Sequence, residues 1–93
     1  MQLQLLFLVL VLLVIQAAGA RSLSVSSYYR TPERNAAVGG VPTSLHLQGL
    51  AIDLVGGQAD ILAVAGLWRA LGLDAVVESD HLHLELDGPA VRA

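Results

Sequence analysis

The first twenty residues constrain this chain most, because they carry no charged side chain and every Asp, Glu and Arg lies from Arg21 onward. Residues 5–15 are apolar without a break, and residues 18–20 read Ala-Gly-Ala. A short apolar stretch followed by small residues is typical of a secretory signal peptide. We therefore predict that residues 1–20 form an apolar leader, either a cleaved signal peptide or an uncleaved signal anchor. The alternative is that they form the first helix of the domain, although a surface helix normally has a polar face.

Such a leader predicts export, so we expect the protein in the periplasm or cell envelope, or held at a membrane through residues 1–20. The remaining residues, 21–93, suffice for one small domain, which we expect to be a monomer. The net charge is −3 and the chain has no run of basic residues, which argues against nucleic acid as a partner. The chain has no cysteine, so any metal site must use His, Asp and Glu as ligands.

Residue patterns after Arg21 predict a small α+β domain. Residues 59–71 repeat their apolar side chains at helical spacing, and they predict the main helix. A shorter helix begins at Thr31-Pro32-Glu33, where a hydroxyl precedes a proline at the first helical position. The predicted strands are residues 22–29, 50–55, 75–77 and 82–86. The last two flank a short polar turn typical of a hairpin, so the predicted sheet is antiparallel.

Three side chains that could bind a metal ion stand out, namely His46, Asp53 and His83, with His81 beside the last. Asp53 lies at the centre of the apolar run 50–55, where an unpaired buried carboxylate would be costly. His81 and His83 share a face if residues 82–86 form a strand, because side chains alternate along a strand. Spacing alone leaves open that these histidines are surface or hydrogen-bonded residues.

Three separated motifs resemble one known family. Residues 27–40 contain a Ser-x-Tyr-Arg turn followed by an Asn and a Gly-Gly pair, and residues 44–53 read Ser-x-His-x-x-Gly-x-Ala-x-Asp. Residues 80–83 then match an x-His-x-His strand. In this order the motifs resemble the zinc D-Ala-D-Ala carboxypeptidases and phage peptidoglycan endopeptidases, whose fold is shared with the hedgehog signalling domain. The resemblance covers roughly residues 22–86.

The resemblance implies that His46, Asp53 and His83 bind Zn²⁺ and leave a fourth position for water. The acid that the family places three residues before the last ligand is Asp80 here, and it is the candidate general base. His81 is the alternative base, because related zinc peptidases use the first histidine of their His-x-His strand.

Further residues enter the predicted site by the same resemblance. Glu78 is a third candidate for the general base, or else part of a solvated turn. Arg30 matches the family arginine that holds a substrate carboxylate or carbonyl, and Ser44 is a hydrogen-bonding group near it. Their alternatives are a surface charge and a turn hydroxyl.

The function that this resemblance implies is hydrolysis of peptide bonds in bacterial peptidoglycan, by a D-Ala-D-Ala carboxypeptidase or a cell-wall endopeptidase. The protein would be exported, or it would be a phage lysis protein or virion component. The alternative is a metal-binding but inactive module of the same fold that binds cell-wall peptide or a protein. The short stretch between Asp53 and His83 motivates this alternative, because family domains usually carry a longer insert there.

Overall fold

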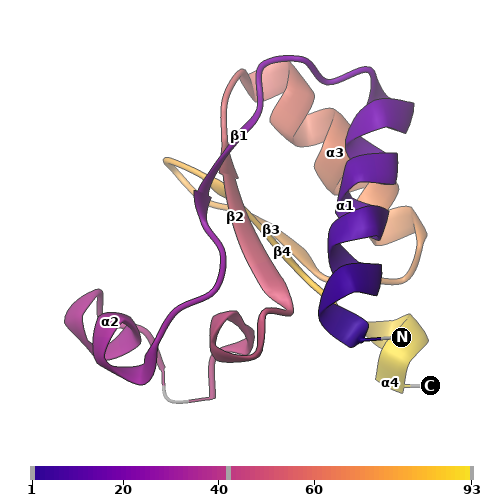
Figure 1. Ribbon diagram of the computed structural model, residues 1–93. Helices are drawn as coiled ribbons and strands as arrows, with labels where there is room; N and C mark the ends of the chain where they lie inside the picture. Colours follow the sequence, from indigo (N-terminus) through magenta and orange to yellow (C-terminus); the bar gives the residue numbers. More distant parts are fainter. Residues whose placement is uncertain (1, 42, 93) are drawn as a thin grey trace.

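The computed structural model describes residues 2–41 and 43–92 and contains one four-stranded antiparallel sheet with two helices packed on one face (Figure 1). In space the strands follow the order β1-β2-β4-β3. The strands are β1 (Ser24–Ser27), β2 (Ala51–Val55), β3 (Ala75–Val77) and β4 (Leu82–Glu85). The helices are α1 (Leu3–Ala18), α2 (Pro32–Ala37), the 3-10 helix η1 (Leu45–Gln48), α3 (Gln58–Ala70) and α4 (Pro89–Arg92). The predicted α+β fold is confirmed.

The two central strands, β2 and β4, have one apolar and one polar face. Ile52 and Leu54 of β2 and Leu82 and Leu84 of β4 belong to the buried core. Because side chains alternate along a strand, the residues between them face away from that core. The alternation thus places the polar residues of both strands on the sheet face opposite α1 and α3.

Helix α3 covers the sheet with the face that the sequence pattern predicts. Its buried side chains are Ile61, Val64, Ala65 and Trp68. The Trp68 ring is fully buried, and its indole N–H donates a hydrogen bond to the backbone oxygen of Glu85 at 3.2 Å. The helix is therefore bonded directly to the end of β4 as well as packed on it.

The apolar segment that we assigned to a leader forms helix α1, which packs beside α3 (Figure 1). Phe7, Val11 and Val14 are buried. Phe7 makes an edge contact with the ring of Trp68 at 5.8 Å, so the structure places this segment in the arrangement that we gave as the alternative. Cleavage after residue 20 stays a prediction.

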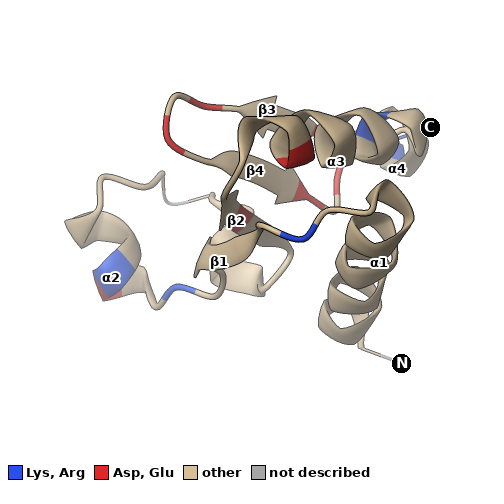
Figure 2. Cartoon of the chain, turned by 90° about the horizontal axis from the view of Figure 1, so that it is seen from above, with Lys and Arg blue, Asp and Glu red and all other residues tan. Residues whose placement is uncertain are grey.

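The outer side of α1 remains apolar and exposed. Figure 2 shows the helix without a single charged residue, and its exposed side chains include Leu3, Leu5, Leu12 and Leu13. Within residues 2–41 and 43–92, no helix combines the length and the apolar character that crossing a membrane requires.

Two elements of the structure were not expected from the sequence. The 3-10 helix η1 lies in residues 44–53, where the sequence showed a motif but predicted no helix, and α4 begins at Pro89, beyond the last predicted strand. The predicted first strand is also shorter than expected, because β1 covers only Ser24–Ser27. Of these differences, η1 matters most for the site, because it carries His46.

Candidate metal centre

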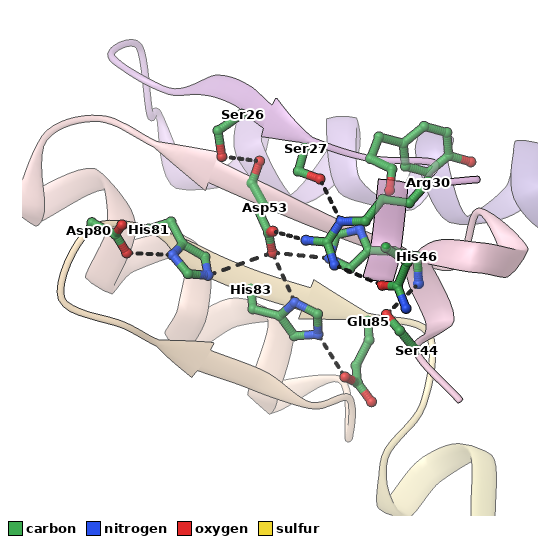
Figure 3. Close-up of polar contacts among 12 residues, drawn as sticks. Ser26, Ser27, Arg30, Ser44, His46, Asp53, Asp80, His81, His83 and Glu85 are labelled. Atoms are coloured by element: carbon green, nitrogen blue, oxygen red, sulfur yellow. Dashed lines mark hydrogen bonds and ion pairs between the residues drawn. The ribbon is translucent and has the colours of Figure 1, made fainter. Parts of the chain in front are cut away.

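Asp53 and His83 lie directly opposite each other on the neighbouring strands β2 and β4. This register brings Nδ1 of His83 to 2.9 Å from Oδ1 of Asp53 (Figure 3). Cross-strand neighbours in an antiparallel sheet are about 4.5–5.5 Å apart at Cβ, so the pair needs no special loop to meet. Asp53 is 6% exposed, and the buried carboxylate that the sequence predicted is present.

His46 reaches the same carboxylate from η1. Ser44 caps this helix by accepting a hydrogen bond from the backbone N–H of His46 at 3.2 Å. Gly49 ends the helix with φ of 68°, a left-handed conformation that favours glycine. This short helix turns His46 inward, where it is 2% exposed.

The backbone of Tyr28 determines which nitrogen of His46 faces Asp53. Nδ1 of His46 lies 2.6 Å from the backbone oxygen of Tyr28. A carbonyl oxygen can only accept, so Nδ1 must carry the proton and donate it. In the neutral ring, Nε2 is then an unprotonated acceptor. Tyr28 is itself fixed, because its hydroxyl donates to the backbone oxygen of Gly49 at 2.7 Å.

Two acceptors therefore face each other at the centre of the site. Nε2 of His46 lies 3.3 Å from Oδ1 of Asp53. Among the described residues, it is the one buried side-chain nitrogen or oxygen without a hydrogen-bond partner. Buried polar atoms are normally satisfied, and a lone pair facing a carboxylate is unfavourable unless a cation, either a metal ion or a second proton on the ring, lies between them.

The donor set fits a zinc ion. His46, Asp53 and His83 offer ligand atoms that all lie within 4.8 Å of one another. Zinc readily binds imidazole nitrogen and carboxylate oxygen, and three protein ligands leave a fourth position open. His46 and His83 are also oriented through their other nitrogens, as metal-binding histidines usually are.

The charges around Asp53 keep it ionised. Burial alone would raise the pKa of Asp53, but hydrogen bonds and positive charge from the rings of His46 and His83, when these are protonated, bring it well below its ordinary range. The hydrogen bond to Asp53 raises the pKa of His83, and burial opposes this while the bond to Glu85 adds to it. Asp53 is therefore ionised, as a carboxylate that binds a metal ion must be.

Arg30 binds the second oxygen of the same carboxylate. Its Nη2 lies 3.1 Å from Oδ2 of Asp53, and its Nε and Nη1 donate to Ser27 and Asn35 at 3.2 and 3.3 Å. The backbone N–H of Arg30 also donates to the backbone oxygen of His46 at 3.1 Å. Arg30 therefore orients Asp53, a role that the sequence did not indicate.

Asn35 anchors the loop that follows α2. It is 3% exposed, and its side-chain nitrogen donates to the backbone oxygen of Val41 at 2.8 Å. A Cβ atom at Gly40 would lie 2.0 Å from Oδ1 of Asn35, so only glycine fits there. The Gly-Gly motif therefore lets the loop close over the amide that supports Arg30.

His81 and Asp80 lie at the open side of the cluster. Nε2 of His81 is 3.8 Å from Oδ1 of Asp53, and its Nδ1 is 2.6 Å from Oδ1 of Asp80. The side chain of Asp80 is 83% exposed, whereas that of His81 is 29% exposed. The histidine is therefore the nearer of the two to the ligand atoms, and the aspartate is bonded to its far nitrogen.

These side chains, except that of Asp80, line a cleft of about 390 Å³. Its walls contain every residue that the sequence assigned to the site except Asp80, and they add Glu85, Val41, Val76 and Gly40. The predicted residues found in the walls are Arg30, Ser44, His46, Asp53, Glu78, His81 and His83. The sequence motifs therefore converge on one concave surface.

Glu85 was missed by the sequence analysis. Its carboxylate Oε1 lies 2.8 Å from Nε2 of His83. The signal was present in the sequence, because Glu85 follows His83 by two residues and so shares its face of the strand. Tyr28 gave no such signal, since it acts through a backbone oxygen.

A partly buried His–Asp–His cluster on the open face of a small antiparallel sheet defines a candidate mononuclear metal protein. A family model described as Peptidase M15 matches residues 5–85. The chain therefore belongs to the peptidase M15 family, the zinc D-Ala-D-Ala carboxypeptidase family that its motifs resemble. Comparison with curated proteins gave no match.

Proposed function

We propose that this protein is a zinc-dependent peptidase that hydrolyses peptide bonds of bacterial peptidoglycan, as a D-Ala-D-Ala carboxypeptidase or as a cell-wall endopeptidase. The observation that carries the proposal is the unpartnered Nε2 of His46, which faces a carboxylate oxygen of Asp53 inside a cleft. Membership of a zinc-dependent peptidase family supports the reaction class. Peptidoglycan as the substrate is supported by the motifs alone.

His46, Asp53 and His83 would hold the ion through Nε2, Oδ1 and Nδ1, the atoms that converge in the structure. A bound zinc ion lowers the pKa of its water towards about 7 and polarises a carbonyl group. Arg30 keeps Asp53 in place through its other oxygen. The protein thereby supplies a fixed geometry with one side open to the cleft.

We assign the general base to His81. Its Nε2 points towards the ligand atoms, and Nδ1 is bonded to Asp80. In the neutral ring, a proton on Nδ1 donated to Asp80 leaves Nε2 free to accept a proton from the attacking water. His81 can later return that proton to the leaving amine. Asp80 then acts as the residue that orients His81, and Glu78 is a wall of the cleft.

Arg30 and Ser44 are proposed to bind the substrate. A guanidinium has five N–H donors, and Ser27, Asn35 and Asp53 occupy three of those of Arg30. Two donors remain for a substrate carboxylate or carbonyl, and Arg30 lines the cleft.

The test is digestion of purified peptidoglycan by the full chain, with added zinc and with a chelator, followed by mass analysis of the released fragments. The proposal predicts fragments that appear only with zinc, and their masses identify the bond. Stoichiometric zinc binding without fragments would favour the inactive binding module, with peptide binding as its readout. Fragments that persist in chelator would contradict the zinc mechanism.

The proposed substrate also indicates where the protein acts. Peptidoglycan lies outside the cytoplasm, so we propose that the protein acts in the cell envelope or is released during phage lysis. The mass of the protein recovered from its host tests whether residues 1–20 are removed. A chain that starts after residue 20 supports a cleaved signal peptide, and a chain that retains α1 contradicts cleavage.

A further inference from the structure

His83 is held between two carboxylates. Its Nδ1 lies 2.9 Å from Oδ1 of Asp53, and its Nε2 lies 2.8 Å from Oε1 of Glu85 (Figure 3). Glu85 is two residues further along the same strand, so both side chains leave the same face of the sheet. Each ring nitrogen of His83 therefore has one specific partner.

The backbone of Glu85 is fixed on both sides. Its N–H donates to the backbone oxygen of Asp74 at 3.2 Å, and its oxygen accepts from the buried indole of Trp68 at 3.2 Å. Trp68 is 0% exposed and packs in the core. The core of the domain therefore fixes the backbone from which the Glu85 side chain extends, and that side chain is only 24% exposed.

The Glu85 contact decides which nitrogen of His83 is free. Both carboxylates only accept hydrogen bonds, so without a metal ion each contact calls for a proton, on Nε2 for Glu85 and on Nδ1 for Asp53. A metal ion bound at Asp53 would take the place of the proton on Nδ1, and the neutral ring would keep its remaining proton on Nε2, facing Glu85. His46 has the opposite tautomer, with its proton on Nδ1 and its free lone pair on Nε2.

We propose that Glu85 is a positioning residue that holds His83 in the Nε2–H tautomer and so presents Nδ1 to the metal ion. The inference rests on the proposed metal site, and it adds a residue to that site which binds neither metal nor substrate. Carboxylates in this position strengthen a histidine ligand by orienting its ring and raising its basicity.

The first test is zinc affinity, measured by competition with a chromophoric chelator at fixed pH. Glu85→Ala is expected to weaken zinc binding by about 10–100-fold, the usual cost of losing such a partner. Glu85→Gln retains an oxygen acceptor and the side-chain shape, so it is expected to recover part of the loss. Asp87→Asn removes a carboxylate two residues further along and is the matched control, expected to leave the affinity unchanged.

The second test is a spectroscopic signature that a merely structural role would not change. In the zinc-loaded, ¹⁵N-labelled protein, long-range proton–nitrogen correlation spectra report which ring nitrogen of His83 bears the proton. The wild type is expected to show His83 bound through Nδ1 with a slowly exchanging proton on Nε2. In Glu85→Ala that proton is expected to exchange faster, while the His46 signals keep their tautomer.

The outcomes separate this inference from the proposed function. The inference would be overturned if the wild type binds zinc and Glu85→Ala shows the same zinc affinity and the same His83 signals. The proposed metal site would not be affected by that result. Metal bound through Nε2 of His83 would also overturn it. A wild type that binds no zinc would overturn both. Thermal melts of the zinc-free variants identify a folding defect, and Glu85→Gln then decides the outcome if Glu85→Ala does not fold.

Discussion

Nε2 of His46 and Oδ1 of Asp53 face each other across 3.3 Å as two hydrogen-bond acceptors. The relationship arises because the backbone oxygen of Tyr28 occupies the other nitrogen of His46. Without a cation between them, the two lone pairs repel each other in a region that water reaches poorly. This arrangement distinguishes the site from a histidine that merely completes a hydrogen-bond network.

The ligand and the base can be separated by mutation. His46→Ala is expected to abolish stoichiometric zinc binding, because it removes one of three ligands. His81→Ala is expected to keep the zinc and to lower turnover by about 10²–10⁴-fold, the usual contribution of a general base. Metal analysis and a peptidoglycan assay on the same preparations measure both effects. Zinc retained by His46→Ala would show that the ligand assignment is wrong.

A second prediction concerns the contact between Asp80 and Nδ1 of His81. Asp80→Asn keeps the size of the side chain but weakens the bond that orients His81, so turnover is expected to fall less than in His81→Ala. Glu78→Gln tests the third candidate for the base and is expected to change turnover little, because we assign the general base to His81. If Asp80→Asn abolished turnover while His81→Ala preserved it, Asp80 would be the base.

Helix α1 contributes to stability through the buried ring of Phe7, which contacts two other aromatic rings. Phe7 is 0% exposed between Tyr28 and Trp68, and Phe7→Ala is expected to lower the free energy of unfolding by about 3–5 kcal/mol. Leu12→Ala is the control within the same helix, because Leu12 is 65% exposed. Denaturant titrations of both variants measure the difference. Equal stability of the two variants would contradict the packing of α1 on the core.

Asp60 links the start of α3 to the segment before β1, and this contact depends on pH. Its Oδ2 accepts hydrogen bonds from the Ser22 hydroxyl at 2.7 Å and from the backbone N–H groups of Ser22 and Arg21. These bonds lower the pKa of Asp60, those from Ser22 most strongly. A lowered folded-state pKa contributes stability above the ordinary value of 3.8, which is lost as the pH falls through the folded value.

Asp60→Asn is therefore expected to lower the melting temperature near pH 7 and to have a smaller effect in acid. Ser22→Ala, which removes the hydroxyl partner, is expected to act in the same direction. Thermal melts across the acid range measure both variants. A deficit in Asp60→Asn that stayed constant down to the lowest pH would exclude the ionised carboxylate as its cause.

The sequence predicted the parts of the site that depend on strand periodicity. The central position of Asp53 in an apolar run and the shared face of His81 and His83 follow from the local sequence alone. In the structure Asp53 lies within β2, and both histidine rings lie on its side of the sheet. The tautomer of His46 was not predictable, because it depends on a backbone oxygen of Tyr28. The same holds for Arg30, whose contact with Asp53 joins segments 23 residues apart in the chain.

For helix α1, the sequence alone could not decide between a leader and a helix of the domain. An apolar run without a polar face gives the same pattern in a signal peptide and in a helix packed on a core. Only the position of Phe7 against Trp68, which depends on the fold of α3, distinguishes the packed helix. Because the exposed side of α1 also consists mainly of leucines, the sequence shows no difference between the buried and the exposed side of this helix.

The most direct test of the central claim is X-ray absorption at the zinc edge of the loaded, full-length protein. Two imidazole nitrogens and one carboxylate oxygen are expected, together with a water oxygen, at about 2.0–2.2 Å from the ion. The zinc signal should be lost from His46→Ala. A coordination sphere with three imidazoles, or one unchanged by His46→Ala, would contradict the assignment of His46, Asp53 and His83 as the three ligands.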